Sequence, residues 1–402
     1  MEKKMGCLTA DDMNPVYILN DNIITSLGFS TAENISAIEH NTIGIRLVND
    51  PLLSPSPVMI SAVNPDELNA KFSEVLRSLK KSAPPESFTR LEKMFIVSIH
   101  DALKDQGIMP GNPRTLFVIS TTKGNVDLLE NRYQAVFSHK RLYLWEMGRI
   151  LQQFFGFSNP PVIISNACIS GVVAMMTAYR HLRSGTYDHA VVTGGDIASE
   201  FVIAGFQSFQ ALSPLPCKPF DINRTGLSLG EGCGTIVLSV IPNKSAGIHI
   251  RITGAATSND ANHISGPSRT GEELSMAIMK AMKQADLTSA NISYIAAHGT
   301  ATPFNDEMES KAIELSGLIL VPVNSMKGYW GHTLGAAGMI ESVAAITALK
   351  KNILFRSAGF ETPGVPVPLN VISEHHTANI KSCLKTASGF GGCNAAIIYQ
   401  KD

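Results

Sequence analysis

The chain has 402 residues, of which 44% are hydrophobic and 17% are charged, and its formal net charge is −1. This composition is typical of a well-filled globular protein and excludes an intrinsically disordered chain. Because the net charge is close to zero, no overall field favours nucleic acid or an anionic membrane, and we expect no nucleic-acid partner.

The N-terminal stretch MEKKMGCLTADDMNPVYILND lacks the apolar core of a signal peptide. No uninterrupted apolar run is long enough to span a bilayer, so we expect a cytoplasmic protein without a membrane span. The cysteines at positions 7, 168, 217, 233, 383 and 393 include no CxxC pair. In a reducing compartment we expect them to be free thiols.

Strand-like and helix-like runs alternate along most of the chain. The strand-like runs are 115–120, 161–167, 189–195, 234–241, 249–258, 292–299, 318–325 and 394–400. The helix-like runs are 87–106, 143–155, 169–184, 270–285, 306–316 and 336–351. This alternation predicts an α/β fold with largely parallel, buried sheets. The proline-rich and serine-rich segment 47–66 is expected to be mostly loop.

The stretch SNACISGVVAMMTAYRHLRSG (165–185) places a cysteine between a predicted strand and a predicted helix. Val172, Met176 and Tyr179 follow helical spacing, and Gly185 ends the helix. Cys168 therefore lies at a helix N-terminus, where the macrodipole favours a thiolate. Its backbone N–H can also bind an oxyanion. The alternative is a buried cysteine in a tight turn.

Two histidines, His298 and His332, each follow a predicted strand, as Cys168 does. Ligand sites of open α/β folds gather at the carboxyl ends of strands, so these three residues predict a common site. A structural role for each histidine is the alternative, and Cys168 with both histidines could also form a zinc site. The three residues show no compact ligand spacing, so we expect no metal.

Asp306 and Glu309 have two interpretations. At the start of the predicted helix 306–316 they match a capping box. Glu309 could instead orient Lys327, or a ring nitrogen, from behind the site.

The stretch ASGFGGCNAAIIY (387–399) is rich in glycine just before a predicted strand. Glycine permits positive φ and close backbone approach. The stretch is either a plain turn or a mobile loop that brings the backbone N–H of Phe390 to the reactive centre, with Gly389 and Gly391 beside it.

Five blocks of the sequence resemble motifs of the elongating β-ketoacyl-acyl-carrier-protein synthases of the thiolase superfamily. NACISG resembles the nucleophile turn, AHGTATPFNDEMES the first histidine block, and SMKGYWGHTLGAAGMIES the block with the lysine and the second histidine. CKPFDINRTGLSLGEGCG and GFGGCN resemble two further blocks, and all five keep the family order. The resemblance runs from about residue 14 to the end.

The resemblance implies a thiolase-like fold of two halves, 14–248 and 249–402, related by a pseudo-dyad and packed as a layered α/β/α/β/α core. It also implies a homodimer, although a heterodimer is possible. Cys168 would accept the acyl group, while His298 and His332 would serve decarboxylation and carbanion formation. Lys327 would fix the geometry of the histidine pair, and Phe390 would gate the pocket.

The implied reaction is a decarboxylative condensation with malonyl-acyl-carrier protein, in fatty-acid or polyketide-like synthesis. No bound cofactor is required, because substrates arrive on the phosphopantetheine arm of an acyl carrier protein. Such carriers are typically acidic, so we expect a local basic patch. RSLKK (77–81) is a candidate, and a solvated helix face is its plainer interpretation.

The chain departs from the family pattern in four places. Ser388 replaces an aromatic residue, Cys393 stands where threonine is usual, the segment before KPFD is short, and VYILNDNIITSLG is a loose match. These changes concern the length of the acyl substrate and the gating of the loop. We expect Ser388 to loosen the loop 387–393 relative to family members with an aromatic residue there.

Two other functions remain open. The chain could be a non-catalytic chain-length partner of a condensing enzyme, although such a partner need not keep Cys168, His298 and His332. It could also be a thiolase-type acyltransferase acting on coenzyme A esters, with Cys393 as the second cysteine.

Overall fold

A computed structural model describes residues 13–130, 133, 136–243, 247–261 and 266–402, so Cys7 lies outside the described residues. The strands are β1 Val16–Ile24, β2 Arg46–Val48, β3 Val58–Ser61, β4 Thr115–Ser120, β5 Val162–Ile164, β6 His189–Asp196, β7 Leu229–Gly230, β8 Gly232–Ser239, β9 Ile250–Asn259, β10 Tyr294–Ala296, β11 Val323–Asn324, β12 Ile353–Leu354, β13 His376–Thr377, β14 Ser382–Gly389 and β15 Cys393–Lys401. The α-helices are α1 Thr31–Glu39, α2 Pro65–Ser78, α3 Arg90–Leu103, α4 Leu144–Phe155, α5 Ser170–Arg183, α6 Glu200–Ser208, α7 Glu272–Gln284, α8 Pro303–Leu315, α9 Lys327–Trp330 and α10 Ala337–Lys351.

Ten strands form one large sheet in the order β11-β10-β14-β15-β9-β1-β8-β6-β4-β5. From the edge towards the centre, one half reads β5-β4-β6-β8-β1 and the other reads β11-β10-β14-β15-β9. If the five strands of each half are numbered along the chain, both halves have the order third, second, fourth, fifth, first. The two halves meet where β1 pairs with β9. The chain thus folds as two topologically equivalent halves, as the thiolase-like fold requires. We propose 14–248 and 249–402 as their bounds, which this repeated order supports.

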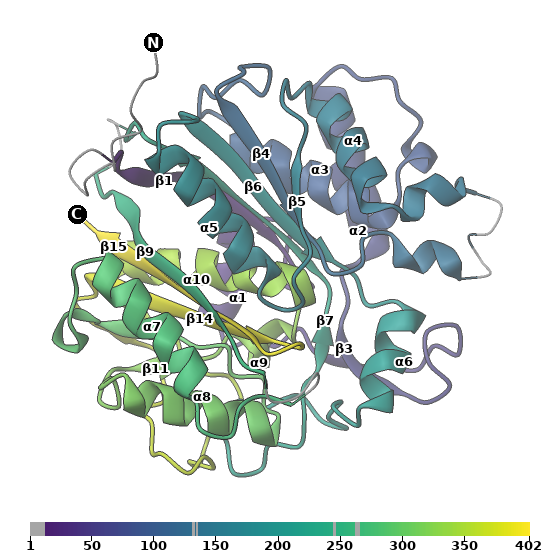
Figure 1. Ribbon diagram of the computed structural model, residues 1–402. Helices are drawn as coiled ribbons and strands as arrows, with labels where there is room; N and C mark the ends of the chain where they lie inside the picture. The colour runs from purple at the N-terminus through teal and green to yellow at the C-terminus, as the bar shows by residue number, and fades with distance from the viewer. Residues whose placement is uncertain (1–12, 131–132, 134–135, 244–246, 262–265) are drawn as a thin grey trace.

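Successive side chains of a strand face opposite sides of the sheet, so each strand contributes to two layers of the core. Leu116 and Val118 of β4 belong to a central core, whereas Phe117 and Ile119 face a second core with α2, α3 and α4. In the other half, alternate residues of β10 face the same central core, and Ile295 between them faces α7 and α8. Figure 1 shows the outer helices of the two halves on opposite sides of the molecule.

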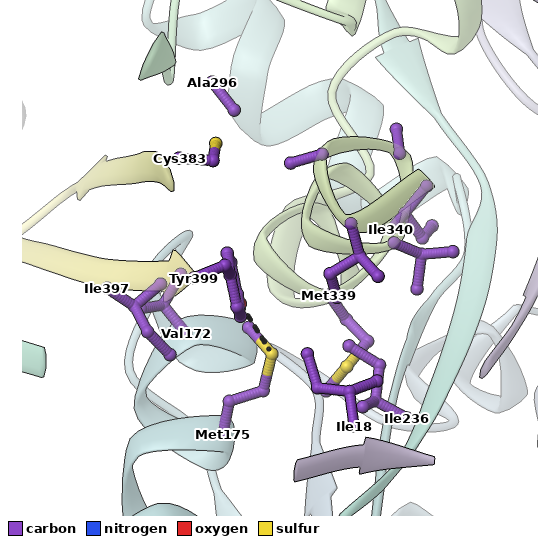
Figure 2. Packing of buried hydrophobic residues seen from close by; sticks show 14 of the residues in the cluster. Ile18, Val172, Met175, Ile236, Ala296, Met339, Ile340, Cys383, Ile397 and Tyr399 are labelled. Atoms are coloured by element: carbon purple, nitrogen blue, oxygen red, sulfur yellow. Dashed lines mark hydrogen bonds between the residues drawn. The ribbon is translucent and has the colours of Figure 1, made fainter. Parts of the chain in front are cut away.

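The central layer consists of α5 and α10, which pack between the two halves of the sheet. Helix α10 is buried around most of its circumference, which suits a helix with a sheet on both sides. Figure 2 shows Met339 and Ile340 of α10 pointing into the cluster that includes Met175 of α5 and Tyr399 of β15. The Tyr399 hydroxyl donates a hydrogen bond to the Met175 sulfur at 3.3 Å.

One expectation from the sequence was wrong. The large sheet is mixed rather than largely parallel. In one half β6 and β8 run antiparallel to each other, and in the other half β14 and β15 do. The segment 47–66 is mostly loop, as expected, although it contains β3 and the end of β2, which form a small sheet with β7. In the described part of the chain, no helix is both long and apolar enough to cross a membrane.

Candidate active site

The cysteine turn is held by its own serine. Ala167, just before Cys168, has φ +43°, a left-handed conformation that non-glycine residues rarely adopt. The Ser170 hydroxyl accepts a hydrogen bond from the Asn166 backbone N–H at 2.8 Å and donates one to the Ala167 carbonyl at 2.6 Å. Ser170 therefore locks the turn that presents Cys168 just before the first residue of α5.

Glycine explains the rest of the motif. A Cβ on Gly171 would lie 2.7 Å from the backbone nitrogen of Met339, so only glycine lets the start of α5 contact α10 this closely. A Cβ on Gly389 would lie 2.9 Å from the backbone nitrogen of Cys168. The cysteine turn is thus packed between the start of α10 and the end of β14.

Cys168 is a thiol rather than a thiolate in the resting protein. It is only 8% exposed, and this burial raises its pKa to about 12, with a further increase from Cys393. Lys327, Lys123 and the backbone N–H of Phe390 act in the opposite direction. Desolvation therefore outweighs the charges that favour a thiolate at this position.

His298 lies beyond β10 on a loop that two buried carboxylates hold. Glu309 accepts hydrogen bonds from the backbone N–H groups of His298 and Gly299, at 2.8 and 2.7 Å. Asp306 accepts from the N–H groups of Thr300 at 2.9 Å and Phe220 at 2.8 Å. Burial raises the pKa of Asp306 to about 6.

The capping-box interpretation of this Asp and Glu pair was wrong, whereas Glu309 does support the site from behind, through a different contact. Helix α8 begins at Pro303, three residues before Asp306, so neither carboxylate caps its first turn. Glu309 binds the backbone around His298 rather than Lys327 or a ring nitrogen. The carboxylate that does bind Lys327 is Glu341 of α10, at 2.6 Å, which the sequence patterns did not single out.

Lys327 lies fully buried behind His298. Its ammonium donates to the His298 carbonyl at 2.6 Å and to the His298 Nδ1 atom at 3.2 Å. An ammonium has only donors, so Nδ1 of His298 is the acceptor and its Nε2 carries the proton.

His332 reaches the same protonation pattern by a different contact. The backbone N–H of Leu334 donates to Nδ1 of His332 at 3.2 Å, which leaves the proton on Nε2. The His332 backbone N–H in turn donates to the Ser228 carbonyl at 2.7 Å. The block CKPFDINRTGLSLGEGCG, which contains Ser228, therefore supports the second histidine.

The two imidazoles are neighbours and are neutral. Their ring centroids are 5.3 Å apart and their planes are nearly perpendicular. Burial lowers the pKa of His298 well below 6.5, and Lys327, His332 and Lys385 lower it further. Burial also lowers the pKa of His332 well below 6.5, together with Lys327, Lys385 and Lys123. Near pH 7 each ring is thus a neutral hydrogen-bond donor through Nε2.

Cys168, His298 and His332 line one cavity of about 560 Å³, as the sequence predicted. Gly389 and Phe390 line it as well, whereas Gly391 has φ +84° in the turn between β14 and β15. In the described parts of the chain, no group of three or more histidine, cysteine, aspartate or glutamate side chains has the arrangement of a metal site.

Phe390 lies in an aromatic cluster at this cavity. Phe390 is 36% exposed, and its ring contacts Phe206 of α6 at 5.7 Å and Phe209, which directly follows α6, at 5.3 Å between centroids. Both also line the cavity, and the sequence patterns gave no indication of either.

The two departures in the glycine loop have clear contacts. The Ser388 hydroxyl donates to the Asn394 side chain at 2.7 Å, across the β14–β15 pair. Cys393 is buried, and its thiol donates to the Phe390 carbonyl at 3.3 Å. Cys393 is not among the described residues that line the cavity.

Models of one protein family match most of the chain. The family model described as beta-ketoacyl synthase, N-terminal domain, matches residues 67–240, and the model for the C-terminal domain of the same family matches residues 249–361. Together the two matches cover more than half of the sequence.

Relatives and solved structures agree with this. The ketoacyl synthase alpha subunit of the tetracenomycin polyketide synthase of Streptomyces glaucescens is 29% identical over 348 residues, 78% of this chain and 82% of the relative. A 3-oxoacyl-[acyl-carrier-protein] synthase 2 of Staphylococcus aureus (strain COL) is 32% identical over 260 residues, 61% of this chain and 63% of the relative.

Two solved structures share the fold. A beta-ketoacyl synthase from Burkholderia phymatum STM815 has a TM-score of 0.83 and 24% identity, covering 97% of this chain and all of that one. A ketosynthase in complex with its chain length factor from Xenorhabdus doucetiae has a TM-score of 0.79 and 24% identity, covering 96% and 98%.

Proposed function

Because this chain belongs to the β-ketoacyl synthase family of condensing enzymes, we propose that Cys168, His298 and His332 carry its reaction, a decarboxylative condensation of an acyl-enzyme with malonyl-acyl-carrier protein. The observation that carries this assignment is the pair of neutral imidazoles, each with its proton on Nε2, in the same cavity as the Cys168 thiol.

The first half-reaction transfers the acyl group. The sulfur of Cys168 attacks the thioester carbonyl, the bond to the carrier's thiol breaks, and the proton of Cys168 passes to that leaving thiol. Because burial raises the pKa of Cys168 to about 12, the proton leaves only as the bond forms. The backbone N–H groups of Cys168 and Phe390 are the proposed donors to the tetrahedral oxyanion.

The second half-reaction removes CO₂. When the malonyl carboxylate leaves, the electron pair moves to the thioester oxygen as an enolate, which needs hydrogen-bond donors. The Nε2–H groups of His298 and His332 are suited to this because both rings are neutral donors. The enolate carbon then attacks the acyl-enzyme, and the Cys168 thiolate leaves and takes up a proton. The product is a 3-oxoacyl thioester on the carrier.

We further propose that the substrates arrive on the phosphopantetheine of an acyl carrier protein, that no resident cofactor takes part, and that the enzyme acts as a homodimer or a heterodimer. RSLKK (77–81) is exposed at the end of α2. A role in carrier docking remains a prediction, since none of these residues lines the cavity among the described residues.

The test is consumption of malonyl-carrier with an acyl-carrier primer, followed by mass spectrometry of the carrier. We expect one equivalent of CO₂ for each 3-oxoacyl product. A product made from two coenzyme A esters without CO₂ release would indicate a thiolase. No turnover by the chain alone, with turnover after addition of a catalytic partner, would indicate a chain-length subunit.

The structure gives the two alternatives little support. A thiolase would use a second cysteine in the cavity, whereas Cys393 is not among the described residues that line it, and its thiol bonds the Phe390 carbonyl. A passive partner would have no need for the polar contacts that fix both histidine rings.

A further inference from the structure

A second lysine, Lys385 of β14, lies completely buried beside the strand end that leads to His298. Its ammonium donates to the Thr386 carbonyl at 2.6 Å and to the carbonyls of Ala296 and Ala297, both at 3.3 Å. It also forms an ion pair with Glu341 Oε2 at 2.7 Å.

These four neighbours are all oxygen acceptors, which defines the protonation state of Lys385. A neutral amine would present a lone pair that none of these atoms can satisfy, whereas an ammonium uses its N–H groups on carbonyls and its charge on the carboxylate. Lys385 is therefore a cation, although burial lowers its pKa.

Glu341 is shared by two lysines. Lys327 binds its Oε1 at 2.6 Å and Lys385 lies beside its Oε2. If Lys385 were absent, the whole negative charge of Glu341 would act on Lys327, in competition with the contacts from Lys327 to His298. With Lys385 in place, one carboxylate is divided between two cations.

The strand end that carries His298 is held by charged side chains at successive backbone groups. Lys385 binds the carbonyls of Ala296 and Ala297, Lys327 binds the carbonyl of His298, and Glu309 binds the N–H groups of His298 and Gly299. Thr386 links these contacts, because its hydroxyl donates to Glu309 at 2.6 Å and its carbonyl accepts from Lys385.

We propose that Lys385 is a positioning residue of the condensing site, which anchors the strand end before His298 and shares Glu341 so that Lys327 stays on the His298 ring. This proposal rests on the proposed function of the same site. Lys385 touches neither substrate nor the reacting atoms, so it acts through His298 and Lys327.

The proposal also predicts a pH effect. The charged groups around His298 are Lys327 of α9, Lys385 of β14, Glu341 of α10 and Glu309 of α8, with His332 beside it. Removing the cation at 385 favours protonated imidazole, so the pKa of His298 should rise. The acid limb of the activity profile should then move to higher pH.

The test compares Lys385→Met, a neutral residue of similar length, with Lys381→Met, which removes an exposed cation just before the same strand. For Lys385→Met we expect kcat for malonyl-carrier decarboxylation to fall by about 10- to 100-fold with little change in KM, since a small misplacement of a reacting group has this size of effect. The acid limb should move to higher pH. Lys381→Met should match the wild type in both.

A second variant, Lys385→Met with Glu341→Gln, covers the case in which the single variant does not fold, because a buried ion pair can often be replaced as a pair. It loses one cation and one anion, so the acid limb should return towards its wild-type position while kcat stays low. A wild-type kcat in this double variant would overturn the positioning role. The same conclusion would follow if a folded Lys385→Met kept the wild-type kcat and the acid limb of its pH profile did not move.

A readout that does not need turnover separates this proposal from the proposed function. The ring C–H signals of His298 and His332 can be titrated by NMR in the wild type and in Lys385→Met. A higher pKa for His298 in the variant supports the role of Lys385 even if the enzyme proves to catalyse another reaction, and equal pKa values contradict it.

Discussion

Cys168 combines a high thiol pKa with direct access to a cavity, and the other described cysteines lack that access. We therefore predict that a thioester-like or haloacetamide reagent that fits the cavity labels Cys168 before any other cysteine. Limited alkylation and peptide mass mapping measure this. Labelling of Cys217 or Cys393 with Cys168 untouched would contradict the assignment of Cys168 as nucleophile.

The separate roles of Cys168 and the histidines lead to a second prediction. Cys168→Gln removes the nucleophile and places a neutral amide carbonyl near the oxyanion donors, where an acyl thioester would lie. This variant should lose condensation yet still release CO₂ from malonyl-carrier, at the wild-type rate or faster, as trapping of labelled CO₂ would measure.

Adding His298→Ala or His332→Ala to Cys168→Gln should abolish this CO₂ release. Loss of one enolate donor costs about 3 kcal/mol, or roughly two orders of magnitude in rate. Undiminished CO₂ release from both double variants would show that the histidines have another role.

At the scale of elements, the contact between α5 and α10 depends on a single glycine. Gly171→Ala would place a Cβ 2.7 Å from the Met339 backbone nitrogen, and backbone cannot move aside cheaply. We expect the free energy of unfolding to fall by about 2 kcal/mol or more and acyl transfer to slow, because the cysteine turn shifts.

Gly205→Ala in α6 is the matched control for Gly171→Ala. A Cβ there meets no atom within 4 Å, so this change should stabilise the protein by about 0.5–1 kcal/mol through helix propensity. Chemical denaturation measures both variants, and similar effects of the two changes would refute the packing argument.

The hairpin of β14 and β15 modifies one sequence-based prediction. Ser388 was expected to loosen the glycine loop, yet its hydroxyl ties β14 to Asn394 of β15. Ser388 also lines the cavity, so Ser388→Phe would fill space there and break this hydrogen bond. We predict that the variant accepts shorter or thinner acyl chains than the wild type, measured by competition between acyl-carrier primers. An unchanged preference would show that the acyl chain does not pass this residue.

The sequence predicted strongly patterned elements well and contacts between distant elements poorly. Strand β4 matches its predicted range, and α5 and α10 lie within a residue of theirs, because apolar periodicity and flanking glycines are local signals. Cys168, His298 and His332 were found because each lies in a motif. Glu341 and Lys385 were missed because each is a lone charged residue in an apolar run, and only the fold shows that they form an ion pair.

At the scale of the whole molecule, the site lies at the junction of the two halves. The first half supplies Cys168 from the turn before α5, and the second supplies both histidines, Lys327 and Lys385. The junction is buried, so its cationic side chains and its neutral rings are all desolvated together. When the pH changes, the titration of these groups should therefore affect both the stability of the fold and catalysis.

The last prediction follows from the two buried histidines. Their pKa values lie well below 6.5 in the folded protein because of burial and nearby lysines, whereas the unfolded chain titrates near 6.5. Below that pH the unfolded state binds more protons, so stability falls as the pH falls, by up to about 1.4 kcal/mol per pH unit for each ring. Burial raises the pKa of Asp306 to about 6, so this group has the opposite effect on the pH dependence of stability. Its folded state binds more protons than its unfolded state, and it therefore adds stability as the pH falls. Comparing the wild type with His298→Gln/His332→Gln cancels the Asp306 effect, which both proteins share. Urea denaturation from pH 7.5 to 5 should show the wild type losing stability relative to this variant, and a constant difference would mean that the rings bind protons as readily in the folded protein as in the unfolded chain.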